Sequence, residues 1–301
     1  MNPAADPNSE SNVHGRWTTA QLTVTVRFVG PARATEASPA NSAAEPGAAK
    51  ARQFVVAAEL AEPPAEYDLA QTGDLRFDAA KEQAAVVGSA LVSFVKGVSH
   101  EQRSDIIKAS LLAQLAANRK VASPATVDEL NAWYGTYFDV LSQIGFAAMD
   151  RSFAPSPVQR TDFDAGAAIL DIATTLLAES SEALSLVRRT LDALRKMPDD
   201  NPSLALLNRA SQATNTSRFQ MTVVDQEHGA GLRMFLMAFG LEAKSGLMQL
   251  PFFRVYTGQV TVQRHSARFA IDAHLLAAVG ETIARRVDPY GDQHIRQLPD
   301  L

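Results

Sequence analysis

The spacing of apolar residues along this chain changes at Ser217, and this change limits the fold more than any other feature. Before it, over residues 99–212, apolar residues recur every three or four positions, which is the spacing of one helix face. After it, Phe219, Met221 and Val223 alternate with polar residues, which is the period of a half-buried strand. Helices and strands are therefore segregated along the sequence, which predicts an α+β fold. We expect a multi-helix, bundle-like middle, then an antiparallel β meander and a C-terminal helix.

Helix-start signals divide the helical middle into several elements. Ser99–Gln102 and Thr126–Glu129 are capping boxes, in which two side chains bond the first free backbone N–H groups of a helix. Asn201 before Pro202 predicts a short helix that ends near Gln212. The other predicted helices run from Asp78 to Lys96, from Thr161 through a break near Ser180, and from Asp272 to a stop before Pro289.

The N-terminal part predicts two strands. Leu22–Phe28 alternates apolar and polar residues, and Phe54–Leu60 is a short apolar run, so the two are expected to pair and to join the sheet. The intervening segment 31–52 is rich in Ala and Pro without periodicity, which predicts a flexible insert. The expected organisation is a disordered tail (1–20), this strand pair with its insert (21–75), a helical region (76–212) and an antiparallel sheet with the C-terminal helix (213–301), with 76–301 forming one compact domain.

The β segment contains one strand that is apolar on both sides. Leu232–Leu241 has apolar residues at both alternations, which favours a strand buried on both faces, with a helix as the competing interpretation. Residues 252–256 and 259–264 predict further strands of the meander. Earlier in the chain, Pro155 and Pro157 predict a loop between two helical stretches.

Composition excludes several classes of chemistry. The chain has no cysteine, which excludes disulfides, thiol nucleophiles and zinc–thiolate or iron–sulfur sites. The net charge is −5 and the basic residues are dispersed, so we expect no nucleic-acid partner, because binding to phosphates requires a concentrated positive surface. The glycine cluster 229–231 lacks the third glycine of a dinucleotide fingerprint and the ending of a phosphate loop, and we predict no cofactor.

The most apolar segment, Ala84–Val95, has 12 residues. As a helix it would extend about 18 Å, against about 30 Å for a bilayer core, so it predicts a buried core helix rather than a membrane span. The N-terminal residues show no basic segment followed by an apolar one, which is the pattern of a Sec signal. We expect a cytoplasmic protein, or one exported by a route without a Sec signal peptide.

The strongest candidate for chemistry is formed by His265, Asp272 and His274. Imidazole and carboxylate are zinc or iron ligands, so these residues would suit a metal site if they converged. The structural interpretation is stronger, because Asp272 is a helix cap, His274 lies in the first turn and His228 fits a hairpin tip. We therefore assign no metal ligand and no catalytic residue. Three further donors precede this group: Asp225, Glu227 and His228.

Two aromatic groups are candidates for a contact surface. Tyr134, Tyr137 and Phe138 fit the buried face of their helix, whereas Trp133 falls off that stripe and is a candidate contact for a partner or a lipid headgroup. The second group is either the core of the sheet or a lipid- or partner-binding surface. It comprises Met234, Phe235, Met237, Phe239, Met248, Phe252 and Phe253.

Three functions follow from these patterns, in decreasing order of support. The first is a non-enzymatic interaction, assembly or effector protein, with a protein partner or self-association. The second is a membrane-associated toxin or virulence factor, based on the apolar segments 84–95 and 169–177, with a membrane surface as its partner. The third is a hydrolase or metalloenzyme that uses His265, Asp272 and His274.

Overall fold

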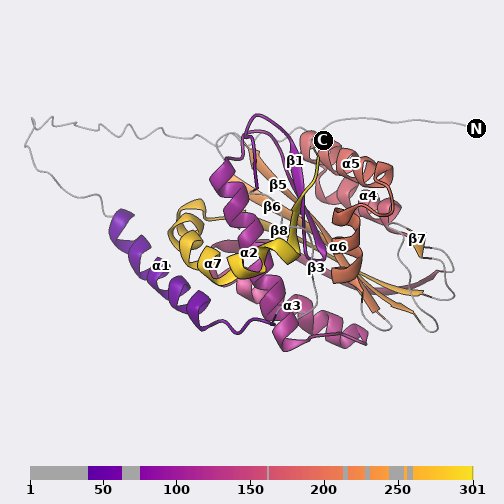
Figure 1. Cartoon of the computed structure of the whole chain (residues 1–301), viewed down its shortest axis with the longest axis horizontal. Helices are drawn as coiled ribbons and strands as arrows, with labels where there is room; N and C mark the ends of the chain where they lie inside the picture. Colours follow the sequence, from indigo (N-terminus) through magenta and orange to yellow (C-terminus); the bar gives the residue numbers. More distant parts are fainter. Residues whose placement is uncertain are drawn as a thin grey trace, which may run out of the picture. The chain divides into compact units, whose positions relative to one another are not determined.

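A seven-stranded mixed sheet lies at the centre of the structure (Figure 1). Neighbouring strands are antiparallel, except that β2 runs parallel to β5. With seven helices in the described part of the chain, the sheet confirms the predicted α+β class. A separate two-stranded sheet pairs β4 (Phe163–Asp164) with β7 (Arg254–Val255). In sheet order the seven strands are β3 (Phe146–Arg160), β8 (Val260–Ile271), β6 (Gly231–Ala243), β5 (Thr216–Glu227), β2 (Ala90–Phe94), β1 (Gln83–Val87) and β9 (Ile295–Gln297).

One compact unit of this computed structural model extends from Pro39 to Leu301. The predicted tail (1–20) and the predicted strand Leu22–Phe28 lie outside the described residues. The structure describes residues 40–62, 75–160, 163–212, 216–227, 231–243, 254–255, 260–299 and 301.

Helices cover both faces of the sheet. On one face, the Tyr134 hydroxyl of α3 donates to the backbone carbonyl of Phe239 in β6 at 3.1 Å. On the other face, Thr190 of α5 is hydrogen-bonded to Ser93 of β2 at 3.0 Å. Helix α2 packs beside α3, and α7 packs between α2 and α1 (Figure 1). The helices are α1 (Ala40–Ala57), α2 (His100–Lys120), α3 (Val127–Gln143), α4 (Ala165–Leu176), α5 (Ser181–Lys196), α6 (Pro202–Ser211) and α7 (Ala273–His294).

Five of the predicted helix starts are confirmed. Ser99 and Thr126 each form a complete capping box with the glutamine or glutamate three residues later. The predicted break is also present, because the Ser180 hydroxyl accepts a hydrogen bond from Ala183 N and begins α5. Asn201 caps α6 and Asp272 caps α7 in the same way. These contacts join groups two or three residues apart, which explains why sequence alone locates them.

The predicted helix from Asp78 to Lys96 is wrong, because β1 and β2 form a hairpin there. Every residue of both strands is buried, so the segment has neither the alternation of a half-buried strand nor a one-sided helical stripe. A short continuous apolar run of this kind does not distinguish strand from helix. Gly88, with φ +53°, provides the left-handed conformation that the turn between the strands requires.

The flexible insert 31–52 and the strand Phe54–Leu60 are also corrected, because helix α1 covers much of both. Its buried residues Ala48, Ala51 and Val55 are three and four positions apart and pack with the core. Two members of this stripe are alanines, and small side chains leave little trace in a hydrophobic pattern.

Two elements, a strand and a helix, continue through prolines at which the sequence predicted a loop and a helix end. Pro155 and Pro157 lie within β3, where a loop was expected. Because β3 is at the edge of the seven-stranded sheet, a missing backbone N–H need not break a ladder there. Helix α7 likewise continues past Pro289 to His294. Its last turn is held from outside, since the His294 carbonyl accepts a hydrogen bond from Gly88 N at 2.7 Å.

The strand over Leu232–Leu241 is confirmed as β6, which lies between β5 and β8 and is buried on both faces. A central strand with helices on both sides has no solvated face, which accounts for its doubly apolar pattern. Of the next predicted strand (252–256), only β7 lies within the described residues, and it pairs with β4 outside the main sheet.

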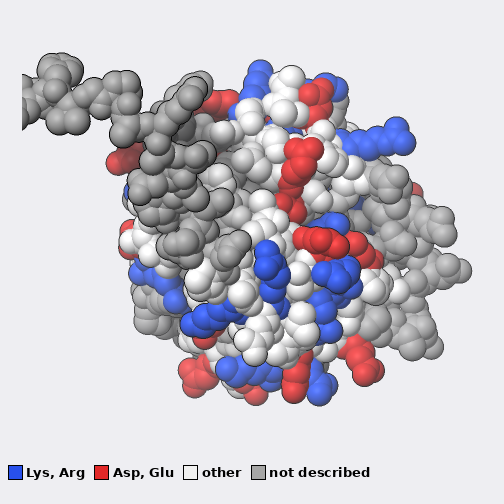
Figure 2. Space-filling model, turned by 90° about the vertical axis from the view of Figure 1, so that its left-hand side faces the viewer, with Lys and Arg blue, Asp and Glu red and all other residues white. Residues whose placement is uncertain are grey.

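Figure 2 shows the side of the unit at the left of Figure 1, where α1 and α7 lie. Lysine and arginine are interspersed with aspartate and glutamate over the coloured part of this face.

Candidate functional site: a polar chamber beside the β1–β2 turn

The structure separates the three residues of the predicted metal or hydrolase site. His265 is buried in the middle of β8, with its ring centre 5.2 Å from that of Tyr134. Asp272 caps α7 and accepts hydrogen bonds from the backbone N–H groups of His274 and Leu275, and the His274 side chain is exposed. Extended chain rises about 3.3 Å per residue, which places His265 roughly 20 Å from Asp272 along the strand. The three side chains therefore do not converge.

The other predicted donors do not complete a metal site either. Asp225 of β5 faces Arg233 of β6, with a carboxylate oxygen 3.4 Å from the guanidinium. Glu227 ends β5, and His228 lies outside the described residues. Within the described ranges, no group of three or more His, Cys, Asp or Glu side chains is arranged to hold a metal ion.

The aromatic candidates belong to the core. Trp133 is fully buried, so the prediction that it contacts a partner or a lipid headgroup is wrong. It stacks on Tyr137 with ring centres 5.6 Å apart, because α3 is covered by α2 on the side where Trp133 projects. Of the methionine and phenylalanine group, the four members in β6 are buried, which supports the core interpretation for them. The remaining three, Met248, Phe252 and Phe253, lie outside the described residues.

The two segments that suggested membrane insertion are parts of the folded core. Ala84–Val95 contains the buried hairpin β1–β2, and Ile169–Leu177 falls mostly within α4, whose inner side packs on the sheet. Among the described residues, no helix combines the length and the apolar character that a membrane span requires.

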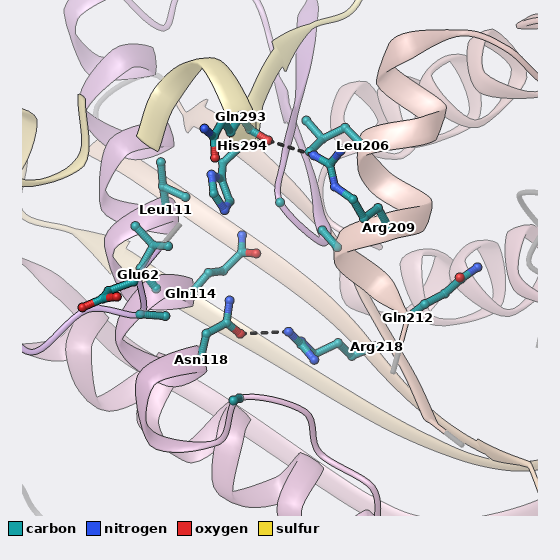
Figure 3. Close-up of a pocket in the computed structure, with 15 residues that line it drawn as sticks. Glu62, Leu111, Gln114, Asn118, Leu206, Arg209, Gln212, Arg218, Gln293 and His294 are labelled. Carbon is teal, nitrogen blue, oxygen red and sulfur yellow. Dashed lines mark hydrogen bonds between the residues drawn. The ribbon is translucent and has the colours of Figure 1, made fainter. Parts of the chain in front are cut away.

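A chamber of about 290 Å³ opens beside the β1–β2 turn (Figure 3). Helix α2 forms one wall and α6 the opposite wall, and the end of α7 closes a third side. Strand β5 contributes Arg218. The volume is at the lower end of the range for small-molecule sites, about 300–1,000 Å³. Its polar lining comprises Glu62, Gln114, Asn118, Arg209, Gln212, Arg218, Gln293 and His294.

Arg218 is the most deeply buried charge of the chamber, with 6 % of its surface exposed. Its guanidinium lies over the ring of Trp133, with Cζ 4.7 Å from the ring centre, and Nη2 donates to Asn118 Oδ1 at 2.8 Å. The same oxygen accepts a hydrogen bond from Trp133 Nε1 at 2.8 Å. Asn118 and Trp133 therefore hold the guanidinium in one orientation. Burial lowers the pKa of Arg218 to about 10, and its Nε has no hydrogen-bond partner among the described residues.

Arg209 and His294 line the part of the chamber where α6 meets the end of α7. Arg209 Nη2 donates to the backbone carbonyl of Gln293 at 3.2 Å, which ties α6 to the end of α7 (Figure 3). His294 Nδ1 lies 3.0 Å from the carbonyl of Tyr290, so Nδ1 carries the proton of the neutral ring. Burial lowers the pKa of His294, and the charge of Arg209 adds to this shift. The described lining thus contains two guanidinium groups and one carboxylate, that of the exposed Glu62.

The wall at the β1–β2 turn is rigid. Gln114 Oε1 accepts hydrogen bonds from Ser89 N and Ser89 Oγ, at 3.0 and 3.2 Å, while its Nε2 donates to the Val87 carbonyl at 2.7 Å. A Cβ atom at Gly88 would lie 2.4 Å from Gln114 Oε1, so a larger residue there would displace the Gln114 amide. The chamber is therefore shaped by fixed contacts of its walls.

Unpartnered polar groups continue from Arg218 along the same face of β5. Gln220 and Thr222 follow at intervals of two, and each is 1 % exposed. Neither polar atom of the Gln220 amide, nor the Thr222 hydroxyl, has a hydrogen-bond partner within the described part of the chain. An unsatisfied buried polar group costs about 1–3 kcal/mol. Water or a ligand group is therefore expected to bond to this row.

Sequence reasoning missed Arg218 and the whole chamber. The apolar alternation of the segment Ser217–Val223 predicts a half-buried strand, and Arg218 falls at a polar position of that pattern. One signal was present: the polar positions of this strand are an arginine, a glutamine and a threonine, although a central strand has no solvated face.

Burial of His265 makes the stability of the fold dependent on pH. Burial lowers the pKa of His265 to about 4, and the charge of Arg151 adds to this shift, whereas an unfolded histidine titrates near 6.5. The unfolded chain therefore binds the proton more tightly between these values, and we expect about 3 kcal/mol of stability to be lost as pH falls from 6.5 to 4. Denaturant unfolding of His265→Gln across this range should show a smaller loss than the wild type.

His274→Gln is the matched control, because it removes an exposed imidazole instead of a buried one. Its unfolding free energy should follow that of the wild type at each pH. A wild-type profile that coincides with that of His265→Gln would contradict the expectation.

Comparison with known proteins gives weak similarities. No known protein family and no curated protein matches the sequence. A solved delta-endotoxin is similar over 71 % of this chain and 88 % of its own, with 12 % identity and a TM-score of 0.31. The structure of the Evf virulence factor is similar over 68 % of this chain and 81 % of its own, with 14 % identity and a TM-score of 0.27. At these TM-scores, neither similarity supports an inference about function.

Proposed function

We propose that this chain is a non-enzymatic binding protein, an effector or assembly component, that holds a small polar molecule in the chamber between α2, α6 and α7. The observation that carries the proposal is the chamber of about 290 Å³ with polar side chains from three helices and one strand on its walls. The contacts of Gln114 and Asn118 fix two of these walls, and a preformed site avoids the entropy cost of ordering on binding.

The chamber is too small to hold a folded protein. We therefore propose that a macromolecular partner binds the outer surface. That partner is another protein or a second copy of this chain, with a membrane surface as the alternative. The end of α7 forms part of the chamber wall. It closes the chamber through His294 and contacts the β1–β2 turn through its carbonyl, so a ligand would stabilise this end of the helix.

Filling the chamber tests the proposal. Ala210 of α6 lines the chamber, and Ala210→Phe would place a ring in the space that a ligand needs. Ala205→Phe is the matched control, since Ala205 is an exposed alanine of the same helix. We expect the folded wild type and Ala205→Phe to retain a small molecule after incubation with a small-molecule extract, as detected by mass spectrometry of the denatured protein. Ala210→Phe should retain at least ~10-fold less.

Circular dichroism and thermal unfolding establish that both variants are folded before the comparison is made. Equal retention by Ala210→Phe and Ala205→Phe would show that the bound molecule lies elsewhere. No retention by any of the three proteins would contradict the proposed function.

A further inference from the structure

We propose that the molecule held in the chamber carries an oxyanion group, a phosphate or a carboxylate, and that Arg218 is the residue that recognises its charge. This inference rests on the proposed function, because it names the chemical class of the ligand for the same chamber. Three observations support it: the missing counter-charge of Arg218, its unused hydrogen-bond donors, and the second guanidinium of the chamber, that of Arg209.

Arg218 is a buried cation without a carboxylate partner. No carboxylate among the described residues lies within ion-pair distance of its guanidinium, and the only side chains it contacts through charge or hydrogen bonds are Trp133 and Asn118, with Tyr134 nearby. A buried charge is retained when it is paired, because desolvation otherwise disfavours it strongly. An anion in the chamber would provide the pairing that the chain itself does not.

Arg103 provides an internal comparison. It is the other deeply buried arginine, and its guanidinium makes four hydrogen bonds: to the carbonyls of Val98, Lys81 and Val95, and to Gln83 Oε1. Within the described ranges, the guanidinium of Arg218 makes a single such bond, to Asn118. Arg103 uses its donors within the fold, whereas the remaining Nη donors of Arg218 are left for a group that the fold does not contain.

The rest of the chamber agrees with an anion. Arg209 lies on the wall formed by α6 and provides a second guanidinium, and the single carboxylate of the described lining belongs to the exposed Glu62 (Figure 3). Arginine is suited to phosphate and carboxylate, because its planar donors match their oxygens. Trp133 and Asn118 hold the Arg218 guanidinium in place before a ligand arrives.

Binding of two simple probes to the full chain tests the inference. Inorganic phosphate and acetate are titrated separately up to about 100 mM, with sodium chloride adjusted to keep the ionic strength constant, and the thermal midpoint is followed. We expect a saturable rise of the wild-type midpoint with at least one probe, and the more effective probe identifies the group. Arg218→Met should weaken binding of that probe on the order of 10- to 100-fold, as expected for loss of a charge-assisted hydrogen bond.

Arg285→Met is the control, because it removes the same charge from an exposed position of α7. It should bind the probe like the wild type. If Arg218→Met does not fold, Arg209→Met replaces it, since Arg209 is only partly buried, and the expected loss is about 3- to 10-fold. Unchanged affinity in the folded variant that is tested would show that the chamber arginines do not recognise the anion.

A wild type whose midpoint does not respond to phosphate or acetate would overturn the oxyanion inference. The retention experiment with Ala210→Phe then distinguishes the oxyanion inference from the proposed binding function. If Ala210→Phe alone fails to retain a neutral molecule, the binding function is supported and the oxyanion inference is rejected. If Ala210→Phe and Ala205→Phe retain the molecule equally, both proposals are rejected.

Discussion

Replacing Arg103 by methionine is expected to lower the free energy of unfolding by about 4 kcal/mol. Arg103 is fully buried, and its guanidinium lies 5.5 Å from the ring centre of Phe94. Methionine retains the apolar contacts but leaves buried acceptors without donors, and each such group carries a desolvation cost. The effect is large because one side chain connects α2 to both ends of the β1–β2 hairpin, at Lys81, Gln83, Val95 and Val98.

Arg119→Met is the matched control on the same helix. Arg119 is exposed, and its pair with Glu59 spans 3.4 Å between two exposed side chains. Exposed pairs contribute about 0–1 kcal/mol, so this variant should unfold within ~0.5 kcal/mol of the wild type. Urea unfolding followed by circular dichroism measures both. Equal effects of the two substitutions would contradict the structural role of Arg103.

Replacing Gly88 by alanine is expected to cost about 3 kcal/mol of stability and to disturb the chamber. A left-handed φ of +53° is unfavourable for alanine by about 1–2 kcal/mol. In addition, the new Cβ would lie 2.4 Å from Gln114 Oε1, so the amide must move and weaken its hydrogen bonds to Ser89. Loss of these bonds adds about 1–2 kcal/mol.

Gly231→Ala is the control that distinguishes the cost of backbone strain from the cost of a steric clash with Gln114. Gly231 also has a left-handed φ, +82°, but a Cβ there meets nothing within 4 Å. We expect it to cost about 1 kcal/mol, from backbone strain alone. Denaturant unfolding gives the difference between the two variants, and probe titration should show that Gly88→Ala alone weakens binding. Equal stabilities for the two variants would show that the contact with Gln114 is unimportant.

The two buried arginines show how far local reasoning extends into the core. Arg103 follows a correctly predicted capping box at Ser99, yet the hairpin that its guanidinium bonds was predicted as a helix. Arg218 lies in a correctly predicted strand, at a polar position of its pattern. The start of α2, which carries Arg103, and the strand that carries Arg218 were both predictable from local sequence. The residues that contact each guanidinium were not, because they belong to other elements of the fold.

Local sequence patterns are sufficient to predict the α+β class and the starts of the helices α2, α3, α5, α6 and α7, because a cap and the groups it bonds lie within three residues of each other. The β1–β2 hairpin is evident only in the folded structure, since a segment buried on every side has no periodicity of its own. The same is true of the chamber. Arg218 and Asn118 are 100 residues apart in the chain and meet only because α2 packs across the sheet. Contacts of that range depend on the packing of whole elements, which no local pattern encodes.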